Sequence, residues 1–137
     1  MKKHTLHSAV FSLIFTALST VFIFTSCMTT PKMPENASAT QLIQLGQDAA
    51  ELGNYKAAEA YYLETIRRYG LDTSIYIETR YELGHLYLSQ KRYDDAYTCF
   101  KEILEIYSNA EFGSVPGSFK KLSQIGLDQI PDKYLER

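Results

Sequence analysis

The sequence predicts an all-α protein in which two helix-turn-helix repeats are followed by a C-terminal capping helix. After residue 38, apolar residues recur at three- and four-residue spacing, the period of a helix with one buried face. Landmark residues also return at a fixed offset of 38 positions. Glycine, asparagine and proline interrupt the apolar pattern between these segments, where helices usually end.

The first two helices are expected over residues 39–52 and 55–69. Ser38 and Gln41 have the spacing of a capping box, in which each residue satisfies the backbone of the other at a helix start. Gly53-Asn54 separates the two helices. Their buried faces are expected to comprise Leu42, Leu45, Ala49, Leu52, Ala58, Tyr62, Ile66 and Tyr69.

The next two helices are expected over residues 75–90 and 93–107. The preceding loop, residues 70–74, offers several N-cap residues, and Asp94 with Asp95 suits the first turn of the later helix. A fifth helix over 117–129 opens after Pro116 and stops before Pro131. We expect it to cover the open face of helix 93–107 with Phe119, Leu122, Ile125 and Leu127, and to expose Lys120, Lys121 and Asp128.

Four landmarks carry the repeat. The pairs are Leu45-Gly46 with Leu83-Gly84, Tyr55 with Tyr93, Ala58 with Ala96, and Tyr62 with Phe100. This pattern resembles the tetratricopeptide repeat (TPR), in which the glycines let two helices approach closely and the alanines supply the small opposing surface. The sequence departs from the family at Thr65 and Ile103, at Gly70 and Ser108, and in its period, 38 instead of 34, with the extra residues expected in the loop Leu71–Ser74. The resemblance implies a short right-handed α-solenoid.

The first 26 residues have the order of a secretory signal peptide. Lys2 and Lys3 precede an apolar stretch, and small residues lead to Cys27. The run ending in Cys27 resembles the lipobox of bacterial lipoproteins, although Phe24 stands where that family usually has Leu, Val or Ile. The resemblance implies acylation of Cys27, with an uncleaved membrane anchor as the alternative.

These assignments divide the chain into four parts. Residues 1–26 are the signal peptide, 27–37 a flexible tether, 38–110 the two repeats, and 111–137 the capping helix and tail. The expected location is the bacterial cell envelope, anchored by lipid on the periplasmic or surface face, with the outer membrane favoured. The 38-residue period is similar to that of envelope lipoproteins associated with outer-membrane assembly and cell division.

The net charge and the small number of residues suited to catalysis or metal binding exclude several classes of function. Removal of Lys2 and Lys3 with the leader would take the net charge from −2 to −4, and an acidic surface disfavours nucleic acid as a partner. His85 is the only histidine outside the leader, so neither the Glu82-x-x-His85 spacing nor a Cys99–His85 pair has the further ligands or catalytic partners it needs. No phosphate-binding glycine loop is present. We therefore expect no enzyme activity, metal or cofactor.

The resemblance implies a binding strip on the first helix of each repeat. By similarity to the family, these helices line the inner, concave surface of the solenoid. An aromatic residue, a histidine and acids on one strip can bind a peptide, whereas a merely hydrated surface is an equally good interpretation. No basic cluster is present to grip a C-terminal carboxylate. The predicted strip comprises Ile43, Gln47, Ala50, Glu51, Glu78, Tyr81, His85, Leu88 and Ser89.

The expected function is that of a membrane-tethered, non-catalytic scaffold or adaptor that binds another envelope protein. The alternative is a transport-associated or small-ligand-binding lipoprotein of the same fold. Self-association through exposed repeat edges stays open, because fold alone does not determine function.

Overall fold

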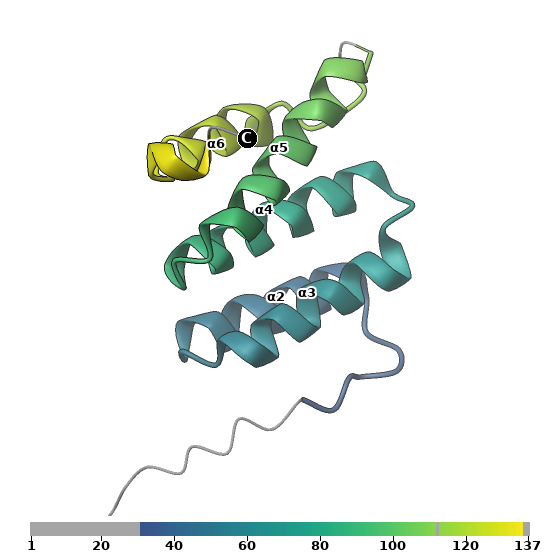
Figure 1. The fold of residues 1–137 in the computed structure, drawn as a ribbon. Coiled ribbons are helices and arrows are strands. Elements are labelled where there is room, and N and C mark those ends of the chain that lie inside the picture. Colours follow the sequence, from purple (N-terminus) through teal and green to yellow (C-terminus); the bar gives the residue numbers. More distant parts are fainter. Residues whose placement is uncertain (1–30, 112, 136–137) are drawn as a thin grey trace, which may run out of the picture.

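A computed structural model describes residues 31–111 and 113–135, so the predicted signal peptide and Cys27 lie outside the described residues. These residues form α-helices and a short 3₁₀ helix, and no strand occurs among them. Figure 1 shows α2 and α3 as one layer, α4 and α5 as the next, and α6 at the far end. The all-α prediction of two helix-turn-helix repeats with a C-terminal helix, an α-solenoid, is confirmed. The elements are α2 (Ala39–Glu51), α3 (Tyr55–Tyr69), α4 (Thr73–Ser89), α5 (Tyr93–Asn109), α6 (Ser118–Leu127) and η2 (Asp132–Tyr134).

The first helix of each repeat ends in the same way. After α2, the Asn54 amide donates to the Ala49 carbonyl at 2.8 Å, and Gly53 has a positive φ of 73°. After α4, the Arg92 amide donates to the Tyr87 carbonyl at 2.9 Å, and Lys91 has a φ of 59°. This is the Schellman arrangement, which reverses the chain through one left-handed residue. The first repeat has glycine there, whereas the second places a lysine in that unfavourable conformation.

Side-chain caps fix where the helices begin. Ser38 and Gln41 form the predicted capping box at α2, with the Ser38 amide donating to Gln41 Oε1 at 2.8 Å. Asn54 Oδ1 accepts from the Ala57 amide at the start of α3. Asp72 Oδ1 accepts from the amides of Ser74 and Ile75, so α4 begins at residue 73.

The additional residues of the long period extend a helix instead of a loop. Thr73–Tyr76 is the first turn of α4, which has 17 residues where α2 has 13. Of the predicted loop Leu71–Ser74, Leu71 and Asp72 do precede α4, whereas Thr73 and Ser74 belong to the helix because Asp72 caps it. The added turn also brings Tyr76 to Glu102 on α5, with the hydroxyl donating at 2.5 Å.

Glycine packed against an aromatic ring sets the spacing of the helices. A methyl group at Gly46 would overlap the ring of Tyr62, and one at Gly84 would lie 2.6 Å from Phe100 Cε1. A methyl group at Gly126 of α6 would lie 2.5 Å from Phe100 Cζ. The Phe100 ring therefore lies against glycines of both α4 and α6. The expected role of Gly46 and Gly84 is confirmed, and α6 uses the same contact.

This contact also corrects the predicted face of the C-terminal helix. Ile125 is 46% exposed, whereas Ser123 and Gly126 are buried. The small residues allow the α6 backbone to approach Phe100, so Ile125, one residue before Gly126, points toward solvent. Phe119, Leu122 and Leu127 are partly buried, and Lys120, Lys121 and Asp128 are exposed, as expected.

An arginine ties the two repeats together. Arg92 donates to Glu59 on α3 at 2.9 Å and to Asp95 at 2.7 Å. Its guanidinium group lies 4.1 Å from the centre of the Tyr87 ring, and the Tyr87 hydroxyl donates to Glu59. The two links to Glu59 join the first repeat to the second, with charge-assisted hydrogen bonds and a cation–π contact acting together.

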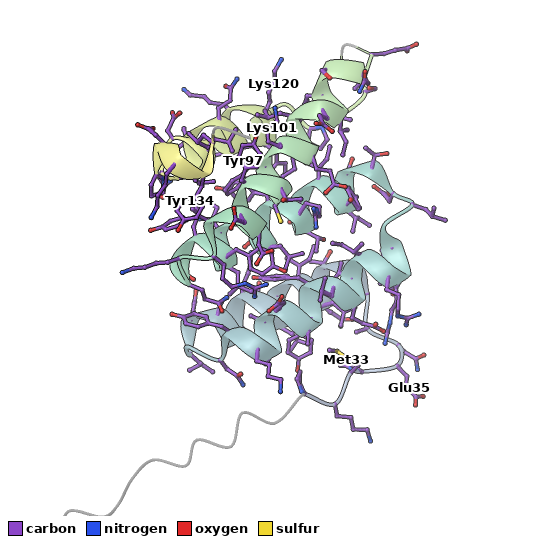
Figure 2. All side chains as sticks on the ribbon, viewed as in Figure 1. Met33, Glu35, Tyr97, Lys101, Lys120 and Tyr134 are labelled. Carbon is purple, nitrogen blue, oxygen red and sulfur yellow. The ribbon has the colours of Figure 1, made fainter. Side chains whose placement is uncertain are left out.

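The end of the predicted tether is held against the first repeat. Arg68 donates to the carbonyls of Pro34 and Glu35, and the Tyr69 hydroxyl donates to the carbonyl of Ala37 at 2.6 Å. Figure 2 shows Met33 and Glu35 on this segment, beside the first repeat. The chain therefore enters the domain at the end of α3.

We predict that Gly126→Ala lowers the free energy of unfolding by about 1–3 kcal/mol, because the added methyl group overlaps the Phe100 ring. Urea denaturation followed by circular dichroism measures this change. Gly117→Ala is the matched control: no atom lies within 4 Å of the position that its added methyl group would occupy, so its effect should be under about 1 kcal/mol. Equal effects of the two substitutions would contradict the proposed close packing.

We predict that Lys91→Gly raises the free energy of unfolding by roughly 0.5–1 kcal/mol, since glycine adopts a positive φ without a steric penalty. The reciprocal change, Gly53→Lys, should destabilise the protein by a similar amount. Thermal and urea unfolding of both variants test the pair. A loss of stability in Lys91→Gly would show that its side chain matters more than its backbone conformation.

Candidate docking groove

Two adjoining hollows form a groove between the first helices of the repeats. They measure about 290 and 410 Å³ and share Ala50, Glu51, Tyr62 and Glu82. We call this surface the α2–α4 groove. It is lined by Gln47, Ala50, Glu51, Tyr55, Tyr62, Glu82, His85, Leu86 and Ser89.

The structure brings five predicted strip residues together in this groove. They are Gln47, Ala50, Glu51, His85 and Ser89. Gln47 Nε2 donates to Glu82 Oε1 at 3.1 Å and so links α2 to α4 across the groove. Glu78 does not line the hollows and lies one turn before Glu82 on the same face of α4. Leu88 packs against the core and is not part of the lining.

Ile43 and Tyr81 of the predicted strip do not line the α2–α4 groove. Ile43 is only 4% exposed and belongs to the core, because α2 buries side chains against both α3 and α4. Tyr81 packs against Phe119 of α6, with ring centres 5.3 Å apart. Since α6 contacts α4 as well as α5, it covers the part of the strip on which Tyr81 lies.

His85 forms the aromatic boundary of the groove. Its ring lies 4.7 Å from the ring of Tyr81 and 6.0 Å from that of Phe100, centre to centre. The side chain nevertheless remains exposed. His85 therefore combines a position fixed by neighbouring rings with a face that a partner can reach.

Carboxylates dominate the electrostatics of the groove. Burial raises the pKa of Tyr62, and the negative charges of Glu82 and Asp48 raise it further. The pKa of Glu78 is also raised, first by burial and then by Glu82. The Coulombic contributions to both shifts come from carboxylates, which indicates negative potential at these two residues.

Sequence reasoning missed Tyr55, Glu82 and Leu86 as groove residues. Tyr55 was not considered because it belongs to α3, the second helix of its repeat. Tyr62 was predicted to be a core residue, and it is only 1% exposed although it also contributes to the wall of the groove. Helical spacing could have identified Glu82 and Leu86, because they lie four and eight residues after the predicted strip residue Glu78, on one side of α4.

Other features offer less for recognition. A hollow of about 470 Å³ between residues 34–37 and α2 has no aromatic or charged side chain in its lining. Cys99 is 1% exposed, and burial raises the pKa of its thiol to about 11, which disfavours the reactive thiolate. In residues 31–111 and 113–135, no cluster of three His, Cys, Asp or Glu side chains is arranged to hold a metal ion.

The same described part of the chain contains no helix that is both long and apolar enough to cross a membrane.

Comparison with known proteins gives one relative and a repeat family. An uncharacterised protein of Treponema pallidum (strain Nichols) is 31% identical over 117 residues, which cover 83% of this chain and 47% of the relative. The chain thus spans about half the length of this curated relative. No solved structure matches. Residues 38–70 and 77–109 each match the tetratricopeptide repeat, and these segments cover α2–α3 and α4–α5. The chain is therefore a protein with two tetratricopeptide repeats, a unit characteristic of protein–protein interaction scaffolds.

Proposed function

We propose that this protein is a non-catalytic docking module that binds a segment of another cell-envelope protein in the α2–α4 groove. The groove itself is the observation that supports this proposal. It combines apolar and aromatic surface from Ala50, Tyr55 and Leu86 with polar groups at Gln47 and Glu82. Peptide recognition by helical scaffolds uses this mixture of apolar contact area and orienting polar groups.

The shape of the groove favours a protein segment over a small molecule. Its two hollows, of about 290 and 410 Å³, are open to solvent, whereas small-molecule sites usually enclose most of the ligand surface. The adjoining hollow extends the surface along α2 to Gln47. Such a shape accepts one or two side chains of an extended chain.

The proposed location follows from the lipobox-like segment. Acylated Cys27 would hold the domain at a bacterial membrane, with the outer membrane favoured and the domain on the periplasmic or surface face. A tether raises the local concentration of the groove near membrane-bound partners, which strengthens weak docking without new contacts.

The docking proposal predicts site-specific cross-linking. A photo-reactive residue at Ser89, which is exposed and lines the groove, should give one dominant protein adduct in the native membrane. The same group at Lys120 on α6 should not give this adduct; Figure 2 shows Lys120 on the far layer of the molecule. Mass spectrometry of the adducts makes the comparison. Identical adducts at both positions would contradict docking in the groove, and an adduct of two copies of this chain would indicate self-association.

The lipidation proposal predicts that Cys27→Ser removes incorporation of an alkynyl fatty acid and releases the protein from membranes. Labelling in cells, followed by fractionation, measures both effects. Cys99→Ser is the matched control, because Cys99 is buried in the folded domain and should not affect labelling. A Cys27→Ser protein that stays with the membrane would favour the uncleaved anchor.

A further inference from the structure

The fold pairs its arginines with carboxylates away from the α2–α4 groove. Arg67 and Arg68 bind Glu64, Arg80 binds Glu102, and Arg92 binds Glu59 and Asp95. These contacts neutralise the acidic residues of α3 and α5 that lie beside them. No lysine or arginine lines the groove.

The carboxylates of the first helices have no such partners. Within residues 31–111 and 113–135, no ion pair includes Asp48, Glu51, Glu78 or Glu82. Their polar partners are neutral: Asp48 accepts from the amide of Gln44, and Glu82 accepts from the amide of Gln47 and from the Tyr62 hydroxyl. Helix α2 contains no lysine or arginine at all.

We infer that the segment bound in the α2–α4 groove carries a lysine or arginine, which lies between Glu51 and Glu82 while an adjacent apolar side chain packs on Leu86 and His85. This inference rests on the proposed docking function and adds the chemistry of the partner. A cation at this position contacts two carboxylates that the fold leaves without an ion pair, and its aliphatic stem covers Ala50 and Tyr55.

Charge alone does not explain the choice of site. Glu105 and Asp128 are exposed carboxylates outside the groove, and neither lines its hollows. The groove differs from them because its carboxylates flank apolar walls and Glu82 is partly buried. An ion pair formed at such a boundary is less screened by water and salt than one at an open surface.

The test begins with a random dodecapeptide library displayed on phage and selected on the protein. Selected peptides are then synthesised with a fluorophore, and their affinities are measured by fluorescence anisotropy. We expect enrichment of lysine or arginine next to a leucine or aromatic residue. The variant E51Q/E82Q should weaken binding by about fivefold or more, whereas the charge-matched control E105Q/D128N should weaken it less than about twofold.

His85→Ala separates failure of the inference from failure of the docking proposal. Neutral or acidic peptides whose binding is weakened by His85→Ala but not by E51Q/E82Q would overturn the cationic partner and leave groove docking intact. Absence of binding, or binding that His85→Ala and E51Q/E82Q leave unchanged, would overturn both. Equal losses in E51Q/E82Q and E105Q/D128N would show non-specific attraction and would overturn the inferred site.

Discussion

The close approach of glycine to an aromatic ring is the contact on which the rest of this structure depends. The rings of Tyr62 and Phe100 occupy space that side chains at Gly46, Gly84 and Gly126 would otherwise fill. The Tyr62 ring therefore limits the approach of α2 to α3, and the Phe100 ring limits the approach of α4 and α6 to α5. Because packed interiors leave little free volume, these contacts determine how closely α2 packs on α3, α4 on α5 and α6 on α5.

The groove is a consequence of that arrangement. When α2 and α4 lie in neighbouring layers, Gln47 and Glu82 meet across them and leave an open hollow toward His85. The Arg92–Glu59 contact also joins the two repeats. The packed core thus sets the positions of the helices, while a few polar side chains set the charge and hydrogen-bonding groups of the groove.

Charge is distributed unevenly over the surface of the domain. Arginines neutralise acids on α3 and α5, whereas α2 carries Asp48 and Glu51 with no basic residue. The result is an acidic inner face on a domain of modest net charge. The net charge alone therefore does not predict the local electrostatic potential of the groove, because that potential depends on which carboxylates form ion pairs.

The sequence by itself determined the helices, their order and the repeat, because capping residues, apolar spacing and the 38-residue offset are local signals. It also identified about half of the groove, including Gln47, Glu51 and His85, from the faces of the first helices. Only the tertiary structure decided that α6 packs through Gly126 on Phe100 and exposes Ile125, that Ile43 enters the core, and that Tyr81 packs against Phe119. Helical periodicity shows which residues share a face, whereas the depth and rotation at which two helices pack depend on side chains from both.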